Sequence, residues 1–149
     1  AVARVVTELE SHLAQIGLSD ETAVLQVAVA LREALVNAVV HGNLEVSSEL
    51  HDQGGSAFTD ALERRRAASP YRERKARLVA RYAPGEVSYV IRDEGPGFDH
   101  QKLPDPTALE NLERTHGRGL MLIRMFMDEV SFNAAGNEIR LVKRRAPAT

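Results

Sequence analysis

The sequence contains no cysteine and no tryptophan, and only 5% of its 149 residues are aromatic. Without cysteine the chain forms neither a disulfide nor a cysteine-ligated zinc site, which suits a reducing compartment. The scarcity of aromatic side chains leaves little for a base-stacking surface. The formal net charge of −2 gives no overall field that would attract nucleic acid or an anionic membrane. Direct binding to nucleic acid is therefore not expected.

Long apolar runs and targeting signals are also missing. No uninterrupted run approaches the length of a membrane span, and no signal peptide is evident. The phosphate-binding pattern Gly-x-x-x-x-Gly-Lys-Ser/Thr does not occur, and neither does Gly-x-Gly-x-x-Gly. Hydrophobic residues nevertheless make up 44% of the chain. A chain of this length can bury about 70% of its unfolded surface, so we expect one domain over residues 1–149.

The hydrophobic periodicity predicts helices first, then two strand pairs separated by a loop and a helix. The expected fold class is α+β, a two-layer sandwich with helices on one face of a mixed, largely antiparallel sheet. Helices are predicted over 2–16, 21–42, 56–66 and 117–127, and strands over 75–82, 87–93, 130–132 and 139–142.

The predicted helix over 21–42 carries a narrow polar stripe. The stripe consists of Gln26, Glu33, Asn37 and His41, which fall within about 80° of one another around the helix. One carboxylate, one amide and one imidazole in so thin a stripe indicate the wall of a cleft. An ordinary solvated helix face is the competing interpretation.

The strand that follows residue 86 ends in an aspartate and two glycines. Val87, Tyr89 and Ile91 share one face, and Asp93 continues it. A carboxylate on an apolar face needs a hydrogen-bonding partner, and Gly95 and Gly97 allow a ligand to approach closely. Asp93 is therefore either a turn residue that accepts from nearby backbone amides or a ligand-binding group.

A second glycine turn, Gly117-Arg118-Gly119, precedes the apolar run that begins at Leu120. Free amides at a helix N-terminus bind anions, and glycine lets a phosphate come close. A flexible joint before a core helix is the alternative. The two glycine turns bracket a loop of about twenty residues, a length typical of lids and binding loops.

Seven basic residues lie between positions 64 and 77, and they have two interpretations. They form a phosphate or nucleic-acid patch, or a solvated or protein-docking surface, which the composition favours. The residues are Arg64, Arg65, Arg66, Arg72, Arg74, Lys75 and Arg77.

Three motifs follow in order: Glu33-x-x-x-Asn37, Asp93-x-Gly95-x-Gly97 and Gly117-x-Gly119-x-x-Leu122. This set resembles the ATP-binding domains of the DNA gyrase, heat-shock chaperone, histidine kinase and mismatch-repair ATPases. The stretch from Leu31 to Asn43 is most similar to the anti-sigma-factor serine kinases. The resemblance implies a Bergerat-type, histidine-kinase-like ATP-binding fold, with an insertion around 44–75 and an ATP lid around 98–116.

The resemblance also implies roles for single residues. Glu33 would be the general base, Asn37 a ligand of Mg²⁺, and Asp93 the acceptor for the adenine amino group, above a floor shaped by Gly95 and Gly97. His41 receives no role and is expected to make a local hydrogen bond. The remaining implied residues contact or neutralise the phosphates: Gly117, Arg118, Gly119 and Leu120 at the helix start, and Lys102 and Arg114 on the lid.

The function implied is that of a cytoplasmic, ATP- and Mg²⁺-dependent protein serine/threonine kinase of the anti-sigma-factor type, which regulates transcription or stress signalling by partner switching. Its substrate would be an anti-anti-sigma-like protein, with a sigma factor as a further partner and a homodimer as an allowed assembly. A non-catalytic ATP-gated binding module and the ATPase part of a histidine kinase are the alternatives. Two departures concern sigma-factor binding more than ATP binding. The 44–75 segment is long, and the strand expected before the first helix is not seen here unless it precedes Ala1.

Overall fold

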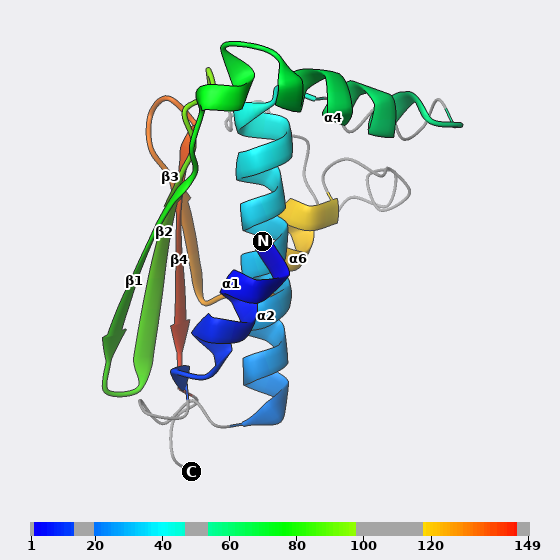
Figure 1. Ribbon diagram of the computed structural model, residues 1–149. Helices are drawn as coiled ribbons and strands as arrows, with labels where there is room; N and C mark the ends of the chain where they lie inside the picture. Colours follow the sequence, from blue (N-terminus) through cyan, green and yellow to red (C-terminus); the bar gives the residue numbers. More distant parts are fainter. Residues whose placement is uncertain (1, 14–19, 47–53, 98–117, 146–149) are drawn as a thin grey trace.

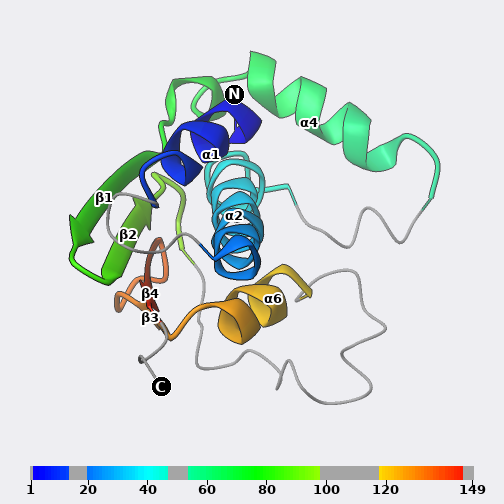
Figure 2. The same ribbon diagram turned by 90° about the horizontal axis from the view of Figure 1, so that it is seen from below.

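The computed structural model describes residues 2–13, 20–46, 54–97 and 118–145 (Figure 1). The helices are α1 (Val2–Glu10), α2 (Glu21–Val36), the π-helix η2 (Asn37–Asn43), α4 (Ala57–Ala67), the 3₁₀-helix η3 (Tyr71–Glu73) and α6 (Arg118–Phe126). The strands are β1 (Arg77–Ala83), β2 (Glu86–Arg92), β3 (Glu129–Phe132) and β4 (Glu138–Arg144). Helices α1, α2 and α6 lie on one face of the sheet, so the expected two-layer α+β architecture is confirmed (Figures 1 and 2).

The four strands form one sheet in the order β1-β2-β4-β3. Both predicted hairpins are present, and β2 joins them by pairing with β4, so that Tyr89 lies opposite Leu141. Every pairing among these described strands is antiparallel, so this sheet is not mixed. The pairing of β2 with β4 brings the end of β2, and hence Asp93, beside the start of β4.

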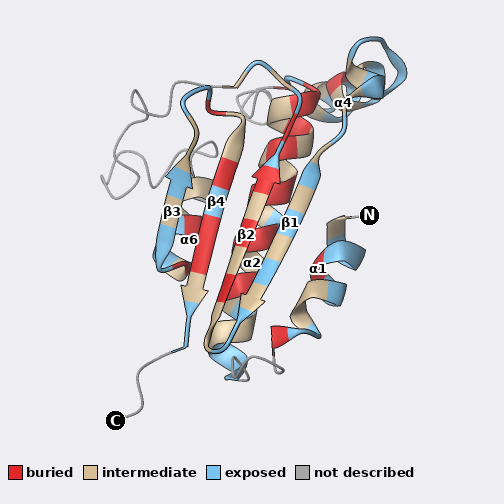
Figure 3. Ribbon diagram, turned by 90° about the vertical axis from the view of Figure 1, so that its left-hand side faces the viewer, coloured by how far each residue is buried: buried red, intermediate tan, exposed pale blue. Residues whose placement is uncertain are grey.

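The core lies between the sheet and α2. Val87, Tyr89 and Ile91 alternate along β2 with their side chains buried, as predicted, and Leu141 continues the buried surface on β4 (Figure 3). Seen end-on, α2 lies between α1 and α6 (Figure 2). Its buried residues are Val27, Ala30, Leu31, Ala34 and Leu35.

Helix α2 starts where the sequence predicts, because the Asp20 carboxylate caps it by accepting from the Thr22 N–H at 3.0 Å. Its last turns differ from the prediction, since the chain continues as a π-helix to Asn43. A hydrophobic period of 3.6 residues carries no information about this change in backbone hydrogen bonding. Helix α1 ends at Glu10, earlier than predicted, since residues 11–13 are described and do not continue the α-helix. Residues 14–16 of the predicted helix lie outside the described residues.

Together α2 and η2 form a 23-residue helical stretch that is long and apolar enough to cross a membrane by length and composition. The sequence had not suggested such a stretch, because Glu21, Arg32 and Glu33 interrupt its apolar residues. Core helices of folded domains pass the same test, and this one packs against α1 and α6.

A smaller apolar cluster joins α4 to the C-terminal end of η2. Val40, Leu44 and Val46 pack there against Ala61 of α4. The partly buried side chains of Phe58, Leu62 and Tyr71 surround this cluster. The predicted short helix over 56–66 is therefore present, with Phe58, Ala61 and Leu62 facing the cluster.

Candidate functional site

The start of α6 lies directly against Glu33 and Asn37, which are one helical turn apart at the junction of α2 and η2. A Cβ atom added at Gly119 would lie 2.7 Å from Glu33 Oε2 and 3.7 Å from Asn37 Nδ2. A side chain at position 119 would thus displace the Glu33 carboxylate. The structure therefore brings together a carboxylate, an amide and the first turn of a helix, all predicted as site residues.

The other two members of the predicted polar stripe make structural contacts at its ends. Lys143 of β4 donates from Nζ to Gln26 Oε1 at 3.0 Å and to the carbonyl of Phe126 at 2.7 Å. His41 Nδ1 lies 2.5 Å from the carbonyl oxygen of Val46, the local hydrogen bond that was expected. Glu33 and Asn37, in the middle of the stripe, are the two members placed against Gly119.

The π-helix begins at Asn37. Its wider turn is visible in the hydrogen bond from the Leu44 N–H to the carbonyl of Val39, five residues earlier, at 3.1 Å. Such segments are rare and frequently occur at functional sites. Here the π-helix leads from Asn37 to Gly42, where the helix meets the turn that contains Asp93.

Asp93 is anchored by its backbone and by one of its carboxylate oxygens. Its N–H donates to the carbonyl of Asn137 at 2.9 Å, which ties the end of β2 to the start of β4. Its Oδ1 accepts from the Gly95 N–H at 2.8 Å. No donor among the described residues reaches Oδ2, although the residue is only 9% exposed. The turn interpretation therefore holds for Oδ1, and Oδ2 has no donor within the part of the chain that the structure describes.

Two glycines let η2 and the Asp93 turn approach one another. A Cβ at Gly42 would lie 2.5 Å from the Asp93 carboxylate, and a Cβ at Gly95 would lie 2.1 Å from the carbonyl oxygen of Gly42. Gly42 is a site residue that the motifs did not predict. The sequence does indicate this position, because glycine is a poor helix former and Gly42 stands at the end of a strongly helical run.

Gly97 supports the same turn from another side. It has a φ of +77°, and a Cβ there would lie 2.0 Å from the carbonyl oxygen of Ala135, in the turn between β3 and β4. The backbone conformation and the contact both favour glycine. Gly97 thus packs the Asp93 turn against the β3–β4 turn.

Burial raises the pKa of Asp93, while the Gly95 amide and the positive charge of Arg74 act to lower it. An ionised carboxylate that has lost water gains from any ligand that donates a hydrogen bond to it. The environment of Asp93 therefore favours a ligand with a hydrogen-bond donor at this point.

Several predicted residues lie outside the described residues: the lid over 98–116, with Lys102 and Arg114, and Gly117. Arg118 begins α6, but its side chain is not described, whereas Leu120 is half-buried in the first turn. The described residues contain no cluster of three or more His, Cys, Asp or Glu. Mg²⁺ needs no such cluster, because it takes one or two protein ligands together with phosphates and waters. The Asn37 amide beside the α6 start fits that arrangement.

Comparison with known proteins agrees with this geometry. Residues 1–143 match the model of the histidine kinase-like ATPase domain family, which includes anti-sigma-factor kinases. No curated protein matches the chain. The match covers α2, η2, the Asp93 turn and α6 in full, and β4 up to Lys143. The resemblance predicted from the sequence is thereby confirmed, and the chain belongs to the histidine kinase-like ATPase domain family.

Proposed function

We propose that this domain binds ATP with Mg²⁺ and transfers the terminal phosphoryl group to a serine of a protein partner. The observation that carries the proposal is the position of the Glu33 carboxylate, against the backbone of Gly119 and one turn from Asn37. Family membership supports ATP binding. Transfer to a serine rests on Glu33, because a module that only binds nucleotide needs no carboxylate beside the phosphates.

The binding half of the proposal uses both ends of the site. Asp93 Oδ2 accepts from the adenine amino group, in a turn where Gly42 and Gly95 leave no side chain in the way. The free amides at the start of α6 face the phosphates, where the helix dipole favours negative charge. Asn37 contributes its amide oxygen to Mg²⁺, which neutralises phosphate charge when bound.

The catalytic half assigns one proton transfer to Glu33. The carboxylate accepts the proton of the serine hydroxyl while that oxygen bonds to the γ-phosphorus. The bond from the γ-phosphorus to the bridging oxygen breaks, and ADP leaves with the electron pair. Asn37 and the α6 amides hold the reacting groups in line, which is most of what phosphoryl transfer asks of a protein.

The partner in this proposal is an anti-anti-sigma-like protein, with a sigma factor as a second partner and the cytoplasm as the place of action. Support comes from the similarity of the Leu31–Asn43 stretch to the anti-sigma-factor serine kinases, and from the presence of such kinases in the family.

The test is a transfer assay with labelled ATP, Mg²⁺ and candidate anti-anti-sigma-like proteins, followed by identification of the modified residue. We expect label on a serine of one partner. Binding of ATP that alters partner affinity without any transfer would replace the kinase by a gated binding module. Label on a histidine would instead indicate the ATPase part of a histidine kinase.

A further inference from the structure

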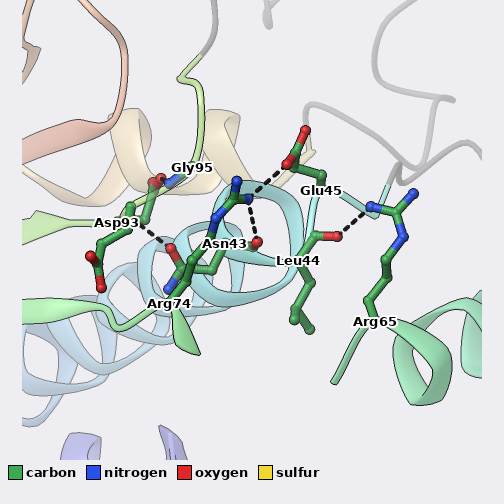
Figure 4. A network of polar contacts seen from close by, with 8 residues as sticks. Asn43, Leu44, Glu45, Arg65, Arg74, Asp93 and Gly95 are labelled. Atoms are coloured by element: carbon green, nitrogen blue, oxygen red, sulfur yellow. Dashed lines mark hydrogen bonds and ion pairs between the residues drawn. The ribbon is translucent and has the colours of Figure 1, made fainter. Parts of the chain in front are cut away.

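Two arginines of the basic segment are partly buried and hydrogen-bonded. Arg65 Nη1 donates to the carbonyl of Leu44 at 2.9 Å, and Arg74 Nη1 donates to the carbonyl of Asn43 at 2.8 Å (Figure 4). Both carbonyls lie at the C-terminal end of η2. Cationic side chains stabilise such an end, because they satisfy carbonyls without helical partners and face the negative end of the helix dipole.

The ring of Tyr71 joins these arginines into one unit. Arg65 Cζ lies 4.4 Å from the ring centroid, and Arg74 Cζ lies 5.2 Å from it. Arg74 also donates to Glu45 Oε2 at 2.7 Å, just beyond the helix end (Figure 4). We refer to Arg65, Tyr71 and Arg74 as the clasp. Cation–π contacts and charge-assisted hydrogen bonds hold the clasp on the end of η2.

The clasp is connected to the Asp93 turn through Asn43. Asn43 is only 3% exposed, and its Oδ1 accepts from the Glu94 N–H at 2.6 Å. The Glu94 carboxylate in turn accepts from the Lys75 N–H, next to Arg74, at 2.5 Å. Arg74, Asn43, Glu94 and Lys75 therefore form a closed loop of contacts directly beside Asp93.

This loop acts on the Asp93 carboxylate in two ways. It fixes the backbone of Glu94, the residue immediately after Asp93, and so limits rotation of the turn. It also brings the Arg74 charge close enough to lower the pKa of Asp93, against the effect of burial. Both effects favour an ionised carboxylate in a constant position.

We propose that the clasp positions the base-recognition turn, with Arg74 as a positioning residue that holds Asn43 and the Glu94 amide so that Asp93 can receive the adenine amino group. The inference rests on the proposed binding of ATP at Asp93. The basic segment would then contribute to nucleotide selection through its hydrogen bonds to the C-terminal end of η2.

The experiment compares ATP with inosine triphosphate, which carries an oxo group in place of the 6-amino group. Calorimetry of the full chain with Mg²⁺ gives the ratio of the two affinities. Because both ligands carry the same triphosphate, contacts to the phosphates contribute equally to both and do not affect the ratio. We expect wild type to prefer ATP and Arg74→Ala to lower that preference about tenfold, the scale of one charge-assisted hydrogen bond. Arg74→Lys keeps the charge but loses the planar fork, so its preference should be intermediate.

Arg66→Ala is the matched control, since Arg66 is exposed on α4 and has no polar partner among the described residues. It should keep the wild-type ratio. Thermal unfolding shows which variants are folded. If Arg74→Ala does not fold, the ratio of affinities measured for Arg74→Lys tests the positioning role instead. If a folded Arg74 variant lost affinity for ATP and for inosine triphosphate by the same factor, the positioning role would be overturned. The proposal that the domain binds ATP would still stand. A wild type without any preference would refute the role of Asp93 itself, and the clasp proposal with it.

Discussion

The long helix formed by α2 and η2 is held by different forces at its two ends. Toward its N-terminus it packs by apolar contact, where Val27, Leu31 and Tyr89 of β2 are all fully buried. Toward its C-terminus, hydrogen bonds and glycine contacts are added to the small apolar cluster with α4. They run from Arg74 to the Asn43 carbonyl and from Gly42 to the Asp93 carboxylate.

This difference indicates that the N-terminal end of the helix serves mainly stability and the C-terminal end mainly function. Apolar burial is favourable and nondirectional, so the N-terminal end stabilises the sandwich without fixing single atoms. The C-terminal end buries polar groups, which is costly unless they are paired, but their hydrogen bonds define positions closely. Changes in the apolar end should therefore alter unfolding, and changes in the polar end should alter ligand binding and chemistry.

The largest expected effect is on phosphoryl transfer. Glu33→Ala should lower transfer roughly 10²–10⁴-fold, the scale of losing a general base, with ATP affinity nearly unchanged. Asn37→Ala should weaken Mg-ATP binding and transfer together. Gln26→Ala on the same stripe is the control and should leave both unchanged, because Gln26 pairs with Lys143. Wild-type transfer by Glu33→Ala would mean that another group is the base.

At the apolar end, Leu31→Ala should lower the free energy of unfolding by about 2–5 kcal/mol, because it leaves a cavity under the sheet. The ATP affinity of the folded fraction should not change. Leu25 of the same helix is 64% exposed, so Leu25→Ala should cost less than about 0.5 kcal/mol. Denaturant unfolding measures both. A Leu31→Ala variant that keeps its stability but loses ATP affinity would contradict the claim that the apolar end of the helix serves stability and the polar end serves ligand binding.

At the polar end, Gly42→Ala tests the contact between η2 and Asp93. The new Cβ would lie 2.5 Å from the carboxylate, so the carboxylate must move. We expect ATP affinity to fall about 10–100-fold, since displacements near 1 Å cost that much in positioned groups. Calorimetry on the folded variant measures the loss. Unchanged affinity would show that Asp93 tolerates displacement and does not bind the base directly.

The smallest effect concerns stability and pH. Because burial raises the folded-state pKa of Asp93, its contribution to stability is full below the unfolded pKa and is lost as pH rises through the folded pKa. Asp93→Asn should therefore be at least as stable as wild type at pH 7, with a smaller advantage at about pH 4, near the unfolded pKa. Glu63→Gln on exposed α4 is the control. A strongly destabilised Asp93→Asn at pH 7 would assign Asp93 a structural role.

Patterns close in sequence predicted much of this site. Alternation along residues 87–93 identified Asp93 on a buried face, and helical spacing paired Glu33 with Asn37. Contacts between distant segments were not predictable, because their partners are chosen by the tertiary fold. Arg74 reaches the carbonyl of Asn43 across 31 residues of sequence. The π-helix was also missed, since one shifted backbone hydrogen bond leaves the hydrophobic pattern unchanged.

The central claim is that the polar end of this helix receives an adenine nucleotide through Asp93. Its most direct test is calorimetric titration of the unmodified chain with ATP and with GTP, each with Mg²⁺. The 6-oxo group of guanine cannot donate to Asp93, so we predict that ATP binds at least about tenfold more tightly than GTP. Equal affinities for ATP and GTP would contradict the claim.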